Sequence, residues 1–315
     1  MSNDARLSGL RVKIQIFKHY PRSINIRGSI IFFIFELSVP YNSVLVKQIE
    51  DLSKNRVKEI RSLQQKKSRE INQLFVIEGK KIVQEYIAAA SGNFCTIRYI
   101  VATTDWIKQN YSVFAHTDLK IYRADYADIK RISNLLTPQG VLAAVEFQRA
   151  VYQPGILLDN VTLAFSSIRD PGNFGTIIRT ADWFGFKNII CSPDSVDHYN
   201  PKVLQSAMGS SLRVNVFYLE LAHLIKDVKE NNIPLYGTSV SGRNFYSEDF
   251  PDAFVLLFGN EASGIDSELL RITDKNISIP RYAEGNDRAE SLNLASSVAI
   301  ITSEIRRRKK VNHSK

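Results

Sequence analysis

Cysteine is scarce in this chain, since Cys95 and Cys191 are the only two among 315 residues. They form no CxxC motif or other zinc spacing, and two distant cysteines give no disulfide framework, so we expect a reducing cytoplasm and no metal. Long apolar runs are also missing. The run at residues 30–35 is far short of the roughly 18 residues that a membrane-spanning helix needs, and it begins too far from Met1 for a signal peptide. We therefore expect a soluble protein that is not bound to a membrane.

Two glycine motifs for phosphate ligands are absent or incomplete. No GxG occurs anywhere, which removes the dinucleotide-binding fingerprint. Gly259 and Gly264 have the spacing of the first half of a P-loop, but Ile265 and Asp266 stand where that motif needs Lys and Ser or Thr. A nucleotide-like ligand held by the backbone fits this loop, whereas a magnesium-bound triphosphate is disfavoured.

Acidic residues are outnumbered, because 41 Lys and Arg against 32 Asp and Glu give a formal charge of +9. With 44% hydrophobic residues, the composition is that of a globular protein. The positive charge is concentrated at residues 54–69 and in a basic tail, 306–315, which has six basic residues and no acid. Both segments suit binding to the phosphates of RNA, and both equally suit solvated helix surfaces.

The order of the hydrophobic patterns predicts two α/β domains, because strand-like and helix-like segments alternate along the chain. Pro154-Gly155 marks the boundary between them. The expected parts are an N-terminal extension of unknown role (1–50), a small α/β domain (51–150), a second α/β domain (155–310) and the basic tail (306–315).

Strand patterns in the first part of the chain fall at 12–17, 30–39, 74–78, 97–101, 119–122 and 141–147, and helical spacing at 49–52, 57–63, 82–90 and 126–133. In the second domain, strand-like runs at 161–165 and 188–191 and a fully apolar run at 254–258 predict a parallel sheet covered by helices on both faces. A further strand is expected at 234–238 and a last helix at about 292–308. Such sheets bind ligands in the loops beyond the carboxyl ends of their strands.

The loop after residue 165 carries the first candidate site residues. Pro171-Gly172 forces a turn, and Asn173 is a candidate cap of the helix that follows. Arg179 lies six residues further on, within the first two turns of that helix, so we expect both side chains to face one pocket. In isolation, a capping Asn and a surface Arg would be the more common explanation. Ser291 and Asn293 are similarly candidate caps of the last helix.

Taken in order, these loops closely resemble the three motifs of the SpoU/TrmH class of SPOUT RNA methyltransferases. The resemblance rests on Asn173-x5-Arg179-x-Ala181, on Gly259-Asn-Glu261-x2-Gly264, and on Ile279-Pro280 followed by Glu290-Ser-Leu-Asn293. It covers residues 155–308, and residues 51–150 resemble the RNA-substrate-binding domain that often precedes the catalytic domain.

The resemblance implies a parallel α/β sheet with a C-terminal trefoil knot, and transfer of a methyl group from S-adenosyl-L-methionine to a ribose 2′-hydroxyl of RNA. We expect rRNA rather than tRNA as the substrate, because a separate substrate domain is present. The family also implies a homodimer. The implied catalytic residues are Arg179, Asn173, Glu261, Ser291 and Asn293, and the implied cofactor-binding residues are Thr238, Gly259, Ile279 and Leu292.

The role of Arg179 stays open between a general base and a cation that stabilises the attacking oxygen, since arginine is effectively always protonated. An alternative function is an inactive RNA-binding module with the same fold. A third, a dinucleotide or nucleoside-triphosphate enzyme, is disfavoured by the missing GxG and P-loop lysine.

Overall fold

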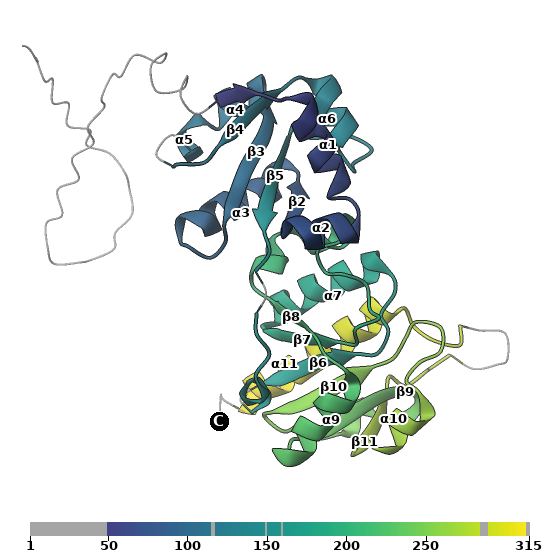
Figure 1. The fold of residues 1–315 in the computed structure, drawn as a ribbon. Coiled ribbons are helices and arrows are strands. Elements are labelled where there is room, and N and C mark those ends of the chain that lie inside the picture. Colours follow the sequence, from purple (N-terminus) through teal and green to yellow (C-terminus); the bar gives the residue numbers. More distant parts are fainter. Residues whose placement is uncertain (1–48, 115–116, 149, 159, 284–288, 313–315) are drawn as a thin grey trace, which may run out of the picture. The chain divides into compact units, whose positions relative to one another are not determined.

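The computed structural model describes residues 49–114, 117–148, 150–158, 160–283 and 289–312, which belong to one compact unit. The strand patterns expected at 12–17 and 30–39 lie outside the described residues. Within the described part of the chain, the strands form two sheets (Figure 1). The predicted α/β fold class is confirmed.

The first sheet has the strand order β1-β4-β3-β5-β2 in the described residues. Strand β5 is antiparallel to both β3 and β2, whereas β1, β4 and β3 are parallel. Its strands are β1 (Ile49–Asp51), β2 (Leu74–Glu78), β3 (Ile97–Thr103), β4 (Ile121–Ala124) and β5 (Val141–Glu146). The accompanying helices are α1 (Lys54–Ser62), α2 (Lys66–Asn72), α3 (Lys80–Ser91), α4 (Thr104–Gln109), α5 (Tyr111–Phe114) and α6 (Tyr126–Ile132).

The second sheet has the order β11-β9-β10-β6-β7-β8, and every pairing in it is parallel. Its strands are β6 (Val161–Phe165), β7 (Asn188–Cys191), β8 (Asn215–Tyr218), β9 (Leu235–Asn244), β10 (Phe254–Phe258) and β11 (Lys275–Ser278). The α-helices are α7 (Pro171–Phe184), α8 (Pro201–Ala207), α9 (Leu221–Glu230), α10 (Ser267–Arg271) and α11 (Leu294–Asn312). Short 3-10 helices are η2 (Pro154–Leu157), η3 (Met208–Leu212) and η4 (Phe245–Ser247). The trefoil knot stays a prediction.

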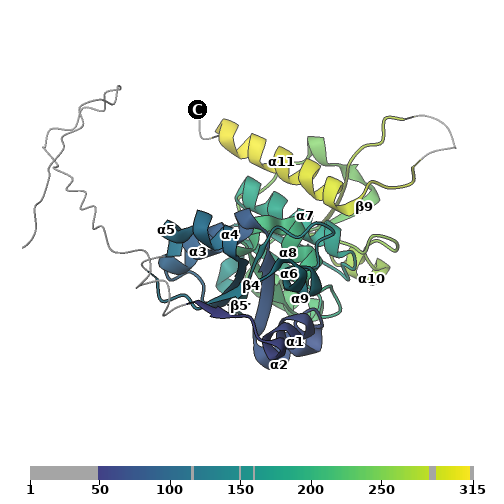
Figure 2. The same cartoon turned by 90° about the horizontal axis from the view of Figure 1, so that it is seen from above.

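Both faces of the second sheet are buried, as its apolar strands predict. Leu163 and Phe165 of β6 pack with α7 and α11 on one face, while the intervening Ala164 packs with α9 on the other. This alternation follows from the two-residue period of a strand. Helix α11 packs along α7, as seen from above in Figure 2. The sheet therefore presents its carboxyl-end loops between covered faces.

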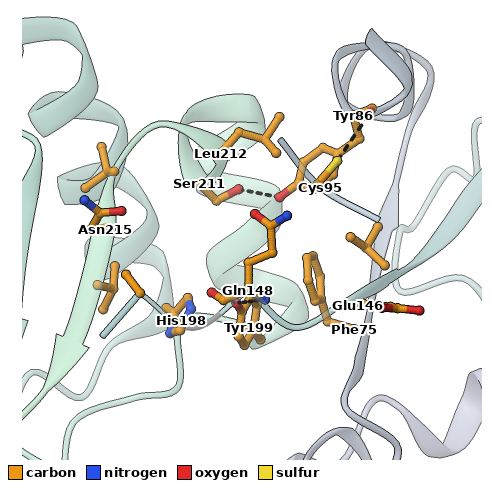
Figure 3. A pocket seen from close by; sticks show the side chains of 14 residues that line it. Phe75, Tyr86, Cys95, Glu146, Gln148, His198, Tyr199, Ser211, Leu212 and Asn215 are labelled. Atoms are coloured by element: carbon orange, nitrogen blue, oxygen red, sulfur yellow. Dashed lines mark hydrogen bonds between the residues drawn. The ribbon is translucent and has the colours of Figure 1, made fainter. Parts of the chain in front are cut away.

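The two sheets are joined by a buried ion pair and an aromatic stack. Arg69 of α2 is 2% exposed, and its guanidinium donates to Asp197 at 2.7 Å. Tyr199 stacks between Phe75 and Phe147, with ring centroids 4.4 and 4.3 Å away. Beside the stack lies a cavity of about 300 Å³, where Tyr86 and Ser211 face each other across a 2.9 Å hydrogen bond (Figure 3).

Two predicted elements differ from the structure. The segment around Ile49 was expected to be helical but forms β1, which pairs with the edge of β4. The strand expected at 234–238 continues to Asn244, because β9 pairs with β11 in two registers. Asn276 pairs with Gly237 while Ile277 pairs with Arg243, so the residues between Gly237 and Arg243 bulge out of the ladder.

Candidate active site

Helix α7 starts at the carboxyl end of β6, where the first motif was expected. Asp170 caps this helix, because its carboxylate accepts a 2.6 Å hydrogen bond from the backbone N–H of Asn173. The prediction that Asn173 is the cap is therefore wrong. Pro171 occupies the first helical position, which suits a residue without an N–H, and so the helix begins before Asn173.

The side chain of Asn173 instead bonds to the third motif. Asn293 donates a 2.9 Å hydrogen bond from Nδ2 to the Oδ1 of Asn173, which joins the first turn of α7 to the start of α11. The Oδ1 of Asn293 also accepts from the backbone N–H of Ser296 at 3.2 Å, so Asn293 is a helix cap as predicted. One amide thus caps α11 and fixes Asn173.

The second motif also reaches the start of α7. The carboxylate of Glu261 accepts from the backbone N–H groups of Arg169 and Asp170, at 3.4 and 3.3 Å. Two backbone hydrogen bonds of 3.0 Å between Asn260 and Gly264 close the loop that carries Glu261. The structure therefore gathers Asn173, Glu261 and Asn293 at the N-terminus of α7.

Asn260 is a linking residue that the predicted set omitted. Its Nδ2 donates to the carbonyl oxygen of Ser167 at 2.7 Å, and its Oδ1 accepts from the backbone N–H of Ala262 at 2.9 Å. One side chain therefore shapes the second loop and ties it to the first. Its place inside the Gly259-Asn-Glu261 motif was the available signal.

Asp194, in the loop after β7, was also missed. Hydrogen bonds from Ser167 and Ser192, followed by the charge of Arg169, lower the pKa of its carboxyl. The bonds from Ser167 and Arg169 measure 2.6 and 2.7 Å. Because β6 lies between β10 and β7, the loop after β6 is held by Asn260 on the β10 side and by Asp194 on the β7 side.

Arg179 lies on the exposed face of α7 with Thr176 and Trp183. Within the described residues its guanidinium has no hydrogen-bond or ion-pair partner. The expectation that Arg179 and Asn173 face one pocket is not met by α7 itself, because six residues turn a helix by about 600°, some 120° short of two full turns. Arg179 is thus presented outward, away from the Asn173–Asn293 contact.

Three of the four expected cofactor residues lie at or beside the carboxyl ends of neighbouring strands. Thr238 lies inside β9, just after the residues that pair with β10, and donates to the carbonyl oxygen of Leu257 at 3.1 Å, beside the end of β10. Gly259 follows β10 and Ile279 follows β11. Because the three strands are parallel neighbours, these residues share one edge of the sheet.

The remaining expected site residues lie just before α11. Leu292 is 51% exposed, and Ser291 is exposed and has no hydrogen-bond partner among the described residues. The structure therefore places both next to Asn293 but joins neither by a side-chain hydrogen bond to the rest of the site.

The loop at Gly259 needs glycine for its own close packing. A Cβ at this position would lie 2.0 Å from the carbonyl carbon of Gly264. The groups at the strand ends are backbone amides, the hydroxyl of Thr238 and the apolar side chains of Ile279 and Leu292. This donor set fits the adenosine part of S-adenosylmethionine, because an uncharged base and ribose can be held by backbone hydrogen bonds and apolar contacts.

No cluster of three potential metal ligands and no helix able to cross a membrane occurs in the described part of the chain. Cys95 and Cys191 are both buried free thiols. Burial raises the pKa of Cys95 to about 11 and raises that of Cys191 further.

The basic tail differs from its expected state. The expectation that its cations are uncompensated is wrong for residues 306–309, which belong to α11. Arg306 donates to the carbonyl oxygens of Phe184 and Gly185, and Arg307 pairs with Glu304. Arg308 bonds to Glu304 and to two backbone carbonyls, and Lys309 bonds to the carbonyl of Asp252. These contacts hold α11 in place.

Comparison with known proteins gives two family matches. Residues 160–303 match the SpoU rRNA Methylase family, and residues 54–143 match the MRM3-like substrate binding domain. The chain is 29% identical over 265 residues to the 23S rRNA (guanosine(2553)-2'-O)-methyltransferase RlmP of Bacillus subtilis, covering 83% of this chain and 100% of that protein.

Comparison with solved structures supports the same family. A putative RNA methyltransferase of the TrmH family from Porphyromonas gingivalis is 32% identical, with a TM-score of 0.69 over 82% of this chain and 99% of the other. An AdoMet-bound rRNA methyltransferase from Sinorhizobium meliloti is 28% identical, with a TM-score of 0.70 over 83% and 98%. The chain belongs to the SpoU/TrmH class of S-adenosylmethionine-dependent RNA 2′-O-methyltransferases. The predicted family and enzyme class are confirmed.

Proposed function

We propose that this protein methylates a ribose 2′-hydroxyl of ribosomal RNA, with S-adenosyl-L-methionine as the methyl donor and Arg179 as the central catalytic residue. The observation that carries the proposal is the convergence of Asn173, Glu261 and Asn293 at the start of α7, the helix that also bears Arg179. The rRNA substrates named for RlmP and for the RlmB of Neisseria meningitidis support the choice of rRNA over tRNA.

Arg179 acts as a cation in this proposal. S-adenosylmethionine supplies an electrophilic methyl group on a sulfonium. The permanently charged guanidinium of Arg179 binds the RNA beside the reactive hydroxyl and stabilises the negative charge that develops on its oxygen. The exposure of Arg179 leaves all its donors available to RNA. The hydroxyl proton leaves to a substrate phosphate or to water.

The other site residues hold this geometry. Asn173, Asn293 and Glu261 fix the start of α7 against the second and third loops. The exposed hydroxyl of Ser291, beside Asn293, contacts the RNA in this proposal. Thr238, Gly259, Ile279 and Leu292 bind the cofactor, mainly through backbone groups and apolar contacts. Neither a metal nor a membrane takes part, and the reaction takes place in the cytoplasm.

The functional unit is a homodimer in this proposal. Trp183 is 84% exposed on the same face of α7 as Arg179, and a large exposed aromatic is typical of an interface anchor. A second copy packed on this face would cover Trp183 and bring Arg179 to the partner's cofactor site. Symmetric dimers are also the commonest oligomers.

Methyl transfer from labelled S-adenosylmethionine to separate pools of unmodified rRNA and tRNA tests the proposal. We expect label in rRNA, mapped to a ribose 2′-oxygen, and at least a 100-fold loss of kcat in Arg179→Ala. S-adenosylhomocysteine binding, measured by calorimetry, should be the same in both proteins. The matched control is Arg271→Ala, an exposed arginine outside the site.

Label in tRNA alone would overturn the substrate assignment. Full activity of Arg179→Ala would overturn the catalytic assignment. A folded protein that binds rRNA but neither S-adenosylhomocysteine nor label would instead establish the inactive RNA-binding module.

A further inference from the structure

The outward face of α1 consists of cations. The exposed residues of this helix are Lys54, Asn55, Lys58 and Arg61, whereas Val57 and Ile60 pack into the first domain. Lys54, Lys58 and Arg61 are spaced by four and three residues, which places them in one stripe along a helix. The exposed face therefore contains no acid and no apolar side chain.

These three cations are free of intramolecular partners, in contrast to their neighbours. Among the described residues, none of the three forms a hydrogen bond or ion pair through its side chain. The guanidinium of Arg56 instead has intramolecular partners, because it bonds to Glu59 at 2.5 Å and to the Tyr122 hydroxyl at 3.0 Å. Glu59, the single acid of α1, also accepts from Tyr99 at 3.1 Å. The helix thus separates its one acid from its outer cations.

The charge at the start of α1 opposes the helix dipole. The first turn contains no acid but begins with Lys54, while the N-terminus of a helix favours negative charge. Ser53 satisfies one backbone N–H there, since its hydroxyl accepts from Arg56 at 3.3 Å. A local preference broken on an exposed face is typical of a functional surface. An anion bound at this face would relieve the conflict.

We propose that Lys54, Lys58 and Arg61 form a docking surface for the phosphate backbone of the RNA substrate. The inference rests on the proposed function and identifies where the substrate domain contacts RNA. With a rise of 1.5 Å per residue, the stripe is about 10 Å long. One strand of a nucleic-acid helix presents about three phosphates over that length. Three cations on a rigid helix therefore match a short run of backbone.

The basic tail does not provide an equivalent surface in the described residues. Arg306, Arg308 and Lys309 bond to backbone carbonyls, and Arg307 bonds to Glu304. Among the side chains that the structure describes in the two basic segments, those of the stripe on α1 thus remain available to phosphate, whereas Arg306 to Lys309 are bonded within the protein.

The test compares two triple variants of the full chain. Lys54→Ala/Lys58→Ala/Arg61→Ala removes the stripe. Lys187→Ala/Lys229→Ala/Arg271→Ala removes two lysines and one arginine that are exposed and unpaired in the second domain, so both variants have the same net charge. The probe is an unmodified large-subunit rRNA transcript, and its binding is measured from about 50 to 200 mM salt.

We expect the stripe variant to lower the slope of log affinity against log salt by between about 2 and 3, and the control to change it by less than about 1. KM for RNA should rise in the stripe variant, while kcat at saturating RNA stays unchanged. The charge-preserving variant Lys54→Arg/Lys58→Arg/Arg61→Lys should keep the wild-type slope. Circular dichroism checks that all variants are folded. If the triple alanine variant is not, Lys58→Ala alone provides the comparison, and it should lower the slope by about 0.7 to 0.9.

An unchanged salt slope in the stripe variant, or an equal loss in the control, would overturn the docking surface. So would a charge-preserving variant that loses RNA affinity while folded. Failure of the proposed function is separate: wild-type protein would then leave rRNA unmethylated, whatever the three variants do to binding.

Discussion

The guanidinium of Arg306, near the end of α11, donates a 2.5 Å hydrogen bond to the carbonyl oxygen of Phe184, the last residue of α7. A second bond of 2.7 Å reaches the carbonyl of Gly185, and the guanidinium lies 4.3 Å from the centroid of the Phe186 ring. Together with the contact between Asn293 and Asn173, this means that α11 holds α7 at both ends. Arg179 lies between the two attachments.

Arg306→Ala should lower the free energy of unfolding by about 1 to 3 kcal/mol, because the last carbonyls of α7 lose a charged donor. Chemical denaturation measures the change. Arg307→Ala is the matched control, since within the described part of the chain that exposed residue bonds only to Glu304, and it should cost less than about 1 kcal/mol. Equal effects of the two substitutions would contradict the attachment.

The hydrogen bond between Asn173 and Asn293 should appear as coupling in a double-mutant cycle. Asn173→Ala, Asn293→Ala and the double variant should give an interaction free energy of about 0.5 to 1.5 kcal/mol in denaturation. Pairing Asn173→Ala with Ser296→Ala gives a control cycle. Additive effects in the first cycle would show that the two side chains do not interact in solution.

Gly175 allows α7 and α8 to approach closely. A Cβ there would lie 2.4 Å from the carbonyl oxygen of Val203 and 2.5 Å from the Cβ of Ser206. Gly175→Ala should therefore destabilise the protein by about 1 to 3 kcal/mol through overpacking. Gly155→Ala is the control, because its Cβ meets no atom within 4 Å. Thermal melting that ranks the two variants in the opposite order would disprove the close contact.

Trp183→Ala should weaken the proposed dimer while leaving the monomer folded. An interface anchor of this kind contributes about 2 kcal/mol or more, which corresponds to a rise of about 30-fold or more in the dissociation constant. Sedimentation equilibrium measures it. Leu136→Ala is the control, because Leu136 is also fully exposed but belongs to the first domain. An unchanged dimer in Trp183→Ala would place the interface elsewhere.

Acid should weaken the ion pairs that Glu304 forms with Arg307 and Arg308 within α11. The hydrogen bond from Arg307, with further help from Arg308, lowers the pKa of Glu304 from 4.5 to about 2. A lowered folded-state pKa means that the contribution of Glu304 is present above about pH 4.5 and is lost as the pH falls toward 2. Between about pH 4.5 and 2, the free energy of unfolding of Glu304→Gln should fall less than that of the wild type, as measured by chemical denaturation. An equal fall in both proteins would show that Glu304 does not contribute to the acid sensitivity.

The sequence was most informative where strands are fully buried. The largely apolar run at 161–165 and the fully apolar run at 254–258 predicted β6 and β10, because parallel strands covered on both faces have few polar positions. The prediction of a helix at Ile49 was wrong. An Ile and a Leu three residues apart are compatible with an edge strand as well as with a helix. Its pairing with β4 depends on distant residues that local spacing does not encode.

The candidate site was predicted in composition but not in contacts. The motifs supplied Asn173, Glu261 and Asn293, and the structure shows that they meet at one helix end. The sequence analysis did not predict Asp194 as a site residue, because a single acid after a strand is a common feature. Its hydrogen bonds to Ser167 and Arg169 form only when β6 and β7 are adjacent. The partners of Arg306 and Lys309 could not be predicted either, because their acceptors are backbone carbonyls, which every residue carries.

The ion pair between Arg69 and Asp197 has a consequence for folding cooperativity. Arg69 also donates to the carbonyls of Leu63 and Gln64, so all its contacts are satisfied only when the two sheets are joined. Parting the sheets without unfolding them would break this ion pair and expose the ring stack around Tyr199 to water. A half-unfolded species with one sheet intact is thereby penalised, and we expect the two sheets to unfold in one cooperative transition.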